Sequence, residues 1–408
     1  MRRVVVTGAA GISPLGNDAD TVLTRLKTGR NAVQRLETWA DYDGLNTNLG
    51  APSNDFSLPS HYTRKTTRSM GRVALMAVRS AELALEGSGL LGDPLLTTGN
   101  VGISYGSSSG TPDAVGDFVQ MLHNKATTGV SANTYLKMMS HTAAVNIGVF
   151  FSITGRVIPT SSACTSGSQG LGYAYETIRQ GKQVAMIAGG AEELSPTQAA
   201  VFDTMFATSV RNDTPHQTPR PFDRDRDGLV IGEGACTFIL EDLDHAAARG
   251  APVVAELVGY GTNSDGVHVT QPCADTMRGA MDLALKDAGL SHADIGYINA
   301  HGTGTTHGDI AESQAIRQLF GEQIPISSLK SYMGHTLGAC GALEAWMSLI
   351  MLQANWFSPN INLDHIDPAC ADLDYIRDTG RILECEYVMS NNFAFGGINT
   401  SLIFRRWG

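Results

Sequence analysis

The sequence predicts an α/β fold in which short buried strands alternate with longer helices. Four runs rich in β-branched residues have the length of buried strands, and four longer segments carry the apolar spacing of helices. The strands are expected at residues 4–6, 101–105, 184–188 and 295–298, and the helices at 70–86, 167–180, 276–288 and 338–353. Such alternation is typical of mainly parallel or mixed sheets that lie between helical layers.

An internal repeat predicts that this α/β unit occurs twice. Three stretches of the first half match three stretches of the second in the same order, and the last match sets Cys164 against Lys330. The pairs are AELALEGSGL (81–90) with MDLALKDAGL (281–290), GISYGSSSG (102–110) with GYINAHGTG (296–304), and PTSSACTSG (159–167) with PISSLKSYMG (325–334). We therefore expect two halves, residues 1–250 and 251–408, with a site at their junction that takes loops from both.

Composition and charge exclude several classes of function. The chain has 408 residues, and its 29 Lys and Arg against 40 Asp and Glu give a net charge of −11, which disfavours binding to nucleic acid. Its six cysteines lack CxxC spacing, so neither a zinc site nor a disulfide framework is expected. The N-terminus has no signal-peptide pattern, and no run approaches the ~20 apolar residues that span a bilayer. We expect a cytoplasmic protein.

Cys164 is the strongest candidate for a catalytic nucleophile. It lies in SSACTSGS (161–168), between a strand-like segment (150–158) and a predicted helix that starts at about residue 166. Free N–H groups and the positive end of the helix dipole favour a thiolate at such a position. The other cysteines in helix-like or strand-like runs fit a structural role; they are Cys236, Cys340 and Cys370.

Two histidines on glycine-rich loops are candidate partners of this cysteine. His301 lies in NAHGTGT (299–305), directly after a predicted strand, where α/β sheets place their sites. His335 precedes the predicted helix 338–353, whose N-terminus lowers the basicity of an imidazole and keeps it neutral. Either histidine alone fits a structural role, but two of them with a cysteine on a third glycine-rich loop indicate a catalytic group.

Two further segments are distinctive. NNFAFGGIN (391–399) sets Phe393 and Phe395 beside glycines, which suits a hydrophobic gate with small-residue hinges, and simple core packing is the alternative. RPFDRDRDG (220–228) is a dense run of alternating charge, which we expect to form a solvated, ordered loop with internal ion pairs.

Six motifs in one order make nearly the whole chain resemble the β-ketoacyl-acyl-carrier-protein (ACP) synthase family, and above all its type II elongating group, β-ketoacyl-ACP synthase II. They are VVVTGAAGISPLG (4–16), SSACTSGS (161–168), RPFDRDRDGLVIGEGA (220–235), NAHGTGT (299–305), SLKSYMGHTLGACGALE (328–344) and NNFAFGGIN (391–399). The resemblance implies a thiolase-like fold, with duplicated βαβαβ-type halves in a layered α-β-α-β-α arrangement. It also implies a decarboxylative Claisen condensation of malonyl-ACP with a cysteine-bound acyl group, which gives 3-oxoacyl-ACP.

The matched motifs imply a catalytic triad of Cys164, His301 and His335. The cysteine would accept the acyl group from acyl-ACP, and the histidines would stabilise the enolate that forms as malonyl-ACP loses carbon dioxide. Lys330 would pair with Glu344 and order the histidine loops. Decarboxylation drives the reaction, so the resemblance implies no metal and no resident cofactor.

Further matched residues imply how the substrate is held. Thr303 and Thr305 would bind the pantetheine arm of the ACP. The N–H groups of Cys164 and Phe395 would stabilise the oxyanion of the attacked thioester. Phe395, with Phe393 beside it, would gate the acyl chain.

Three departures from the family pattern leave the pathway open. Ala394 stands where glycine is usual, and Cys340 lies in GACG where GAAG is usual. HGTGT (301–305) replaces HGTST and is typical of polyketide synthases. The product is therefore expected to belong to fatty-acid synthesis or to a related polyketide or polyene pathway.

The acidic ACP would need a local basic patch on this acidic chain. Residues 56–81 contain no Asp or Glu, and Arg64, Lys65 and Arg68 within them are the predicted docking residues. The spacing of Arg64, Arg68 and Arg72 predicts one shared helix face. A positive stripe on a negative protein would steer an acidic partner to this place.

Alternatives remain for assembly and for class. Residues 100–150 match the family's dimer interface, so a homodimer is implied, and the alternative is the active subunit of a heterodimer with a chain-length factor. A thiolase would need a second catalytic cysteine on a late glycine-rich loop, which this sequence lacks. TGAAGISPLG (7–16) does not have the GxGxxG spacing of a nucleotide-binding loop, and Pro14 interrupts it.

Overall fold

Two halves with the same topology build the molecule. The computed structural model describes residues 1–408. Its main sheet has 11 strands in the order β13-β11-β10-β15-β16-β9-β1-β8-β6-β4-β5. These strands are β1 (Val4–Ile12), β4 (Val101–Gly106), β5 (Val157–Thr160), β6 (Ala185–Glu192), β8 (Gly234–Asp242), β9 (Ala255–Ser264), β10 (Ile295–Asn299), β11 (Pro325–Ser327), β13 (Asp374–Tyr375), β15 (Tyr387–Ala394) and β16 (Ile398–Arg406).

The strand order repeats on the two sides of the contact between β1 and β9. The first half has the order β5-β4-β6-β8-β1, and the second half has β11-β10-β15-β16-β9. β1 and β9 pair antiparallel over only Val4–Val6 and residues 255–257, so this short ladder is where the two half-sheets meet. The predicted duplication is confirmed.

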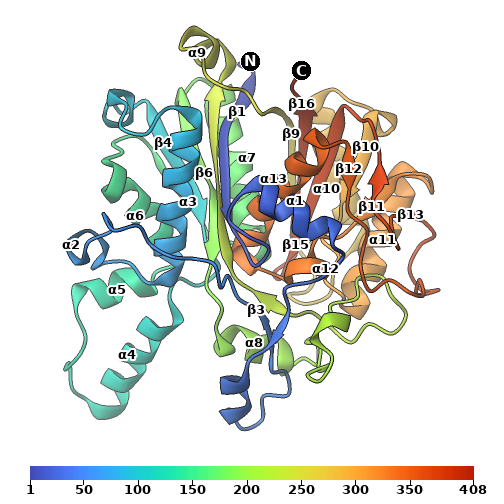
Figure 1. Cartoon of the computed structure of the whole chain (residues 1–408), viewed down its shortest axis with the longest axis horizontal. Coiled ribbons are helices and arrows are strands. Elements are labelled where there is room, and N and C mark those ends of the chain that lie inside the picture. The colour runs from blue at the N-terminus through green and yellow to red at the C-terminus, as the bar shows by residue number, and fades with distance from the viewer.

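Helices cover both faces of each half-sheet and give five layers. α3 (Arg72–Ser88) packs on the outer face of the first half-sheet, and α10 (Ala274–Ala288) on that of the second. α7 (Ser166–Arg179) and α13 (Cys340–Gln353) pack against each other between the half-sheets. Figure 1 shows these layers side by side, with α11 (Thr306–Phe320) beyond α10. This is the predicted α-β-α-β-α arrangement.

Side-chain alternation along the strands divides the core into separate clusters. On β6, Met186 and Ala188 pack toward α7 and α13, whereas Ala185 and Ile187 pack toward α3. Successive strand residues point to opposite faces, so one apolar run supplies two layers of core. The middle layer is therefore apolar on all sides, and α13 is buried along nearly its whole length.

The remaining elements are short or peripheral. They are α1 (Ala19–Lys27), α2 (Arg64–Thr67), α4 (Pro112–Asn124), α5 (Ala132–Met138), α6 (Thr142–Phe151), α8 (Pro196–Asp203), α9 (Leu243–Ala248), α12 (Lys330–Met333), β2 (Gln34–Arg35), β3 (Leu49–Ala51), β7 (Ile231–Gly232), β12 (Trp356–Phe357) and β14 (Arg381–Ile382). None of the helices has both the length and the apolar composition needed to cross a bilayer.

One predicted strand is wrong in its first part. Residues 150–158 were expected to be extended, but α6 continues to Phe151 and β5 begins only at Val157. The apolar run of α6 packs against α3 and β4, and this tertiary packing outweighs the strand preference of its Val, Ile and Phe residues. The four predicted helices match α3, α7, α10 and α13 to within two residues at each end.

Both central helices start with the same tight turn. The 3-10 turn Ala163–Thr165 precedes α7, and the 3-10 turn Leu337–Ala339 precedes α13. Each turn begins at a residue with positive φ, 50° at Ala163 and 45° at Leu337. The structural counterpart of Cys164 is therefore Gly338, and the match of Cys164 with Lys330 is wrong because the second half has extra residues before its helix.

Gly190 on β6 lies against the turn before α13 and the first turn of α7. A Cβ atom at this position would lie 2.3 Å from the carbonyl oxygen of Gly338 and 2.8 Å from Cα of Gly167. Both neighbours are backbone atoms, so no side chain can move away to make room. Only glycine allows the strand to approach both turns this closely.

We expect Gly190→Ala to lower the free energy of unfolding by about 3 kcal/mol or more. This is the upper end of the usual cost of overpacking, because the atoms that the new methyl group meets belong to the backbone and cannot move aside. Gly87→Ala on α3 is the matched control. Its Cβ would meet nothing within 4 Å, so it should stabilise the helix by about 0.5–1 kcal/mol. Urea unfolding followed by circular dichroism measures both, and equal effects would contradict this packing.

Candidate active site

The turn before α7 presents Cys164 to a buried cavity. Ala163 adopts the left-handed conformation, which is uncommon for a residue with a side chain and is often found at functional sites. Two side-chain hydroxyl groups stabilise the turn. Oγ1 of Thr165 donates to the carbonyl of Ser162 at 2.8 Å, and Oγ of Ser166 accepts from the N–H of Ser162 at 3.0 Å. Cys164 is only 5% exposed.

His335 contacts the thiol directly. Its Nε2 lies 3.0 Å from Sγ of Cys164, and its Nδ1 accepts a hydrogen bond from the N–H of Leu337 at 3.3 Å. Because a backbone N–H can only donate, Nδ1 carries no proton in the neutral ring, and the proton is on Nε2. His335 therefore directs an N–H group at the sulfur.

His301 has the same tautomer for a different reason. Nζ of Lys330 lies 3.1 Å from Nδ1 of His301, and an ammonium group can only donate, so the imidazole proton is again on Nε2. The rings of His301 and His335 lie nearly perpendicular, with centroids 5.1 Å apart. The structure thus brings the three predicted triad residues together in one buried cluster.

Lys330 is held as a cation by Glu344. Nζ of Lys330 lies 2.5 Å from Oε1 of Glu344, and the other carboxylate oxygen accepts from Nδ2 of Asn392 at 2.8 Å. Burial is the largest single effect and would lower the pKa of Lys330, but the charge and hydrogen bond of Glu344, with Cys340 and Glu312, together raise that pKa above its ordinary value. The ammonium group is therefore a fixed positive charge beside the histidines and not a proton acceptor.

Both histidines are neutral at physiological pH. Burial is the main cause that lowers the pKa of His301 and of His335 well below 6.5, and the charge of Lys330 lowers both further. The expected neutrality of His335 is thus present, and burial is its main cause.

Burial also determines the resting state of the nucleophile. It raises the pKa of Cys164 to about 11, against the opposing effects of Lys330 and of the backbone N–H groups of Phe395 and Cys164. The N–H groups lower this pKa, as expected, but desolvation is the larger effect, so the resting group is a thiol. Because both N–H groups lower the pKa of the thiol, they lie near the sulfur and so near a carbonyl attacked by it.

The two phenylalanines of residues 391–399 have different surroundings. The ring of Phe395 stacks on Phe202 of α8, with centroids 5.0 Å apart and an interplanar angle of 27°. Phe393 is part of the core of the second half and contacts His301 edge-on, with centroids 6.1 Å apart. The loop after Phe395 is tied down by the N–H of Gly396, which donates to the carbonyl of Val269 at 2.9 Å.

Thr303 and Thr305 line the approach to the triad. Their Oγ1 atoms lie 2.9 Å apart, and both residues line a cavity of about 580 Å³ that also contains Cys164, His301 and His335. The loop is shaped from below by Asp309, whose carboxylate accepts from the N–H of Gly304 at 3.1 Å.

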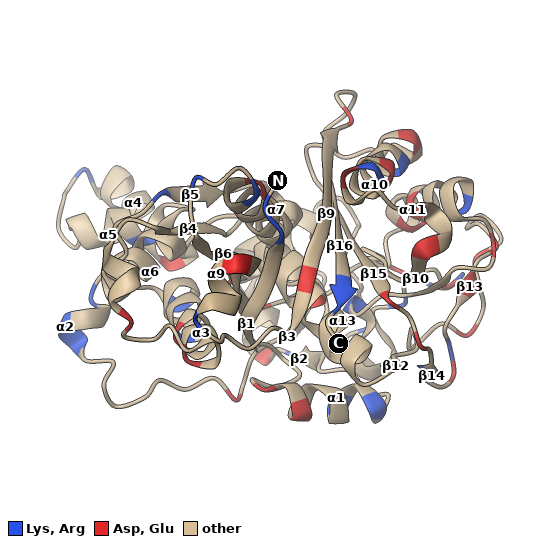
Figure 2. Cartoon of the chain, turned by 90° about the horizontal axis from the view of Figure 1, so that it is seen from above, with Lys and Arg blue, Asp and Glu red and all other residues tan.

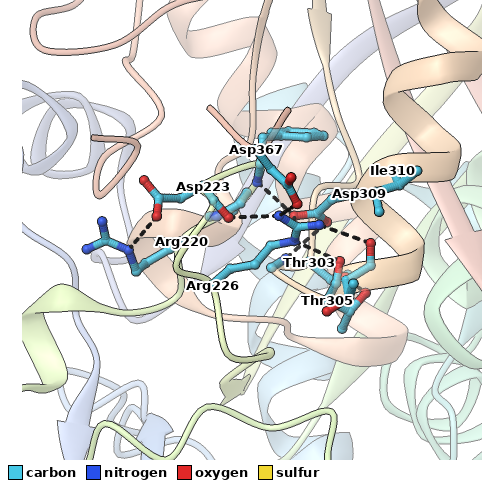
Figure 3. A network of polar contacts seen from close by, with 12 residues as sticks. Arg220, Asp223, Arg226, Thr303, Thr305, Asp309, Ile310 and Asp367 are labelled. Carbon is cyan, nitrogen blue, oxygen red and sulfur yellow. Dashed lines mark hydrogen bonds and ion pairs between the residues drawn. The ribbon is translucent and has the colours of Figure 1, made fainter. Parts of the chain in front are cut away.

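The charged run 220–228 clamps this threonine loop, as Figure 3 shows. Arg226 donates to the carbonyl oxygens of Thr305 and Thr306 at 3.2 and 3.1 Å and to Asp367 at 2.6 Å. The side chain of Arg226 is only 2% exposed, and that of Asp223 is fully buried. The prediction of a solvated loop is therefore wrong for these residues, because their charged side chains are buried at the contact between the two halves.

Sequence reasoning missed Glu312 on α11. Its two carboxylate oxygens accept from the N–H groups of His301 and Gly302, both at 2.7 Å, which fixes the backbone of the first histidine loop. Burial raises the pKa of Glu312 to about 8. The available signal was an acidic pair, Asp309 and Glu312, spaced i, i+3 at the start of the helix that follows the loop.

The predicted docking residues lie on the surface. Arg64, Lys65 and Arg68 are exposed and lie on or directly after α2. The predicted continuous helix face is wrong, because α2 ends at Thr67 and Arg72 begins the separate helix α3, where it pairs with Glu233 at 2.6 Å.

Both halves of the chain match known families over most of their length. Residues 1–246 match the family "Beta-ketoacyl synthase, N-terminal domain", and residues 254–364 match "Beta-ketoacyl synthase, C-terminal domain". The chain is 36% identical to 3-oxoacyl-[acyl-carrier-protein] synthase 2 of Vibrio harveyi, over 99% of each.

Solved structures agree with these matches. A β-ketoacyl synthase from Burkholderia phymatum is 58% identical, with a TM-score of 0.99 and full coverage of both chains. The ishigamide ketosynthase/chain length factor structure is 30% identical, with a TM-score of 0.89 and full coverage of both chains. With the cysteine and both histidines of the site in place, the chain belongs to the β-ketoacyl synthase family.

Proposed function

We propose that the chain is a condensing acyltransferase, a 3-oxoacyl-ACP synthase that extends an acyl chain held on Cys164. The observation that carries this proposal is the buried cluster in which two neutral histidines direct Nε2–H groups at one cavity beside a thiol. Two such donors suit an oxygen that becomes negative during the reaction, and a thiol suits a thioester intermediate.

The first half-reaction moves the acyl group from its carrier to the enzyme. The sulfur of Cys164 attacks the thioester carbonyl, and the N–H groups of Cys164 and Phe395 stabilise the oxyanion. The carbon–sulfur bond to the carrier breaks, and the proton of the Cys164 thiol ends on the carrier's thiol. The Nε2–H of His335 and the charge of Lys330 favour the thiolate at the moment of attack, which offsets part of the cost of burial.

The second half-reaction forms the carbon–carbon bond. The thioester oxygen of the malonyl group accepts hydrogen bonds from the Nε2–H groups of His301 and His335, and the enolate forms as carbon dioxide leaves. Its carbanion attacks the acyl carbonyl on Cys164, the carbon–sulfur bond to Cys164 breaks, and the thiolate that leaves takes up one proton from the solvent. Lys330 fixes the tautomer of His301 and transfers no proton.

The substrate class follows from the shape of the approach. Cys164 lines a cavity that Thr303 and Thr305 also line, which suits a long, thin arm with amide groups such as phosphopantetheine. The relative from Vibrio harveyi is named for an acyl carrier protein. We infer acyl-ACP and malonyl-ACP as the substrates, so that the pantetheine arm belongs to the substrate and no resident cofactor takes part in either step.

Exposed apolar residues indicate a partner chain of the same fold. β5 is the edge strand of the main sheet, with Val157 44% exposed, and α4 exposes Val115, Val119 and Leu122 on one face. An unpaired strand edge and an exposed apolar helix face are both natural contact surfaces. We propose a homodimer, and the alternative is a heterodimer with a chain-length factor, which the ishigamide ketosynthase structure favours. In a heterodimer this chain would be the active subunit, because it keeps Cys164.

The pathway is either fatty-acid synthesis or a related polyketide or polyene pathway. Relatives at 35–37% identity are named 3-oxoacyl-ACP synthases 1 and 2, and a polyketide ketosynthase is among the similar structures. Ala394 and Cys340 both lie at the site. Ala394 ends β15 beside the gate, and Sγ of Cys340 donates to the carbonyl of Cys164 at 3.2 Å.

Cys164→Ala should abolish acyl loading, because no other thiol has access to the cavity. Intact-mass analysis after incubation with a panel of acyl-ACPs measures this, and the mass added to the wild type identifies the acyl chains accepted. His301→Ala is the matched variant. It should still load but should condense about 10²–10³-fold more slowly, since it removes one oxyanion donor. Loading that survives in Cys164→Ala would refute the assignment.

The buried, neutral His335 should make stability fall on acidification. Below about pH 6.5 the unfolded chain gains a proton at this histidine and the folded chain does not, so the folded state loses up to about 1.4 kcal/mol per pH unit. We expect the free energy of unfolding of wild type, relative to His335→Gln, to decrease as the pH falls from 6.5 to 5. Urea titrations at each pH measure it, and parallel curves for the two proteins would contradict the neutral state.

Lys65→Glu with Arg68→Glu should raise KM for acyl-ACP about tenfold, while KM for a small acyl thioester stays the same. Figure 2 shows the basic α2 segment at the edge of the molecule. High salt should reduce the difference, because both side chains are exposed. Arg30→Glu, an exposed arginine elsewhere, is the control. Equal effects on both substrates would exclude α2 as the docking site.

A further inference from the structure

Three apolar side chains are exposed to solvent at the mouth of the active-site cavity. Met205 and Phe206 follow α8 and are 38% and 88% exposed, and Val269, on the loop after β9, is 67% exposed. All three line the cavity that contains Cys164. We call them the apolar rim.

Phe206 has a strained backbone conformation, and its ring gains little packing within the protein to offset that strain. Its φ is +55°, in the left-handed region, which is a genuine outlier for a bulky residue. Strain of this kind persists where it serves a function, and here the ring gains almost no burial in return. An isolated exposed apolar residue is ordinary, but a strained one that stands at the entrance of an active site requires an explanation.

Charge cannot hold an acidic partner at this entrance. The residues that line the cavity include no Lys or Arg, and they include Asp227 and Asp265. Asp227 is paired with Arg211, whose Nε lies 3.5 Å away. Apolar contact is therefore the main attraction that the entrance offers to an acidic protein.

We propose that the apolar rim is the seat of the acyl carrier protein, and that Phe206 is its anchor. This inference rests on the proposed function, because only a carrier that inserts a pantetheine arm must sit over the mouth. The partner it fits has an apolar face around the point where that arm is attached. α2 steers the carrier by charge from a distance, whereas the rim holds it by contact.

The rim adjoins both contacts that hold Phe395 in place. On one side, Phe202 stacks on Phe395 and lies four residues before Phe206. On the other side, the carbonyl of Val269 accepts from the N–H of Gly396, directly after Phe395. A carrier seated on the rim therefore touches the two segments that position the gate.

Phe206→Gly tests this proposal without risk to folding, because glycine adopts a φ of +55° without strain and should raise the Tm. We expect the ratio of KM for acyl-ACP to KM for an acyl N-acetylcysteamine thioester to rise about tenfold. The rise should be the same at low and high salt, unlike that of the α2 variants. Phe206→Leu, which keeps an apolar contact, should restore part of the affinity.

Ile382→Ser is the matched control, since Ile382 is 79% exposed on β14 and lies outside the cavity lining. It should leave the ratio unchanged. If Phe206→Gly also leaves the ratio unchanged while Cys164 still loads from both substrates, the rim is not the carrier's seat and the condensing function stands. If neither substrate loads the wild type, the proposed function itself fails.

Discussion

The buried contact between Lys330 and Glu344 is the interaction on which the chemistry of the site depends. Both side chains are fully buried, and moving two charges out of water is costly unless each is well paired. Glu344 therefore takes a second contact from Asn392, and Lys330 takes one from His301. The single positive charge that results has several effects at once. It sets the tautomer of His301, adds to the effect of burial that keeps both histidines neutral, and lowers the pKa of Cys164 toward that of a usable nucleophile.

The duplicated fold explains why this site lies where it does. α7 delivers Cys164 from the first half, and the loops before α11 and α13 deliver the histidines from the second. Arg226 links the halves further, because this first-half residue donates hydrogen bonds to the backbone of the threonine loop in the second half. Gly190 lets β6 lie against the turn before α13 and the start of α7, so that these contributions converge. Each half alone would contain only part of the reaction.

Much of this could be predicted from the sequence, and the failures have physical causes. The repeat, the central helices and the three triad residues all follow from local patterns, since glycine-rich turns after strands mark where polar side chains are presented. The resting state of Cys164 could not be predicted in the same way, because desolvation depends on what packs around a thiol and not on its neighbours in sequence. The charges at Arg226 and Asp223 were misplaced for the same reason. Alternating charge looks solvated until the partner segments, here residues 303–309 and 364–367, are known.

The burial of Cys164 has a consequence for the protein's chemical durability. Peroxides and disulfides react with thiolates, and a thiol with a pKa of about 11 is almost wholly protonated at neutral pH. Its sulfur is also nearly closed off from solvent. The nucleophile is thus protected from oxidation while the cavity is empty. It becomes reactive only when a ligand occupies the cavity and meets the hydrogen-bond donors around the sulfur, which would make thioester mimics far better covalent inhibitors than general thiol reagents.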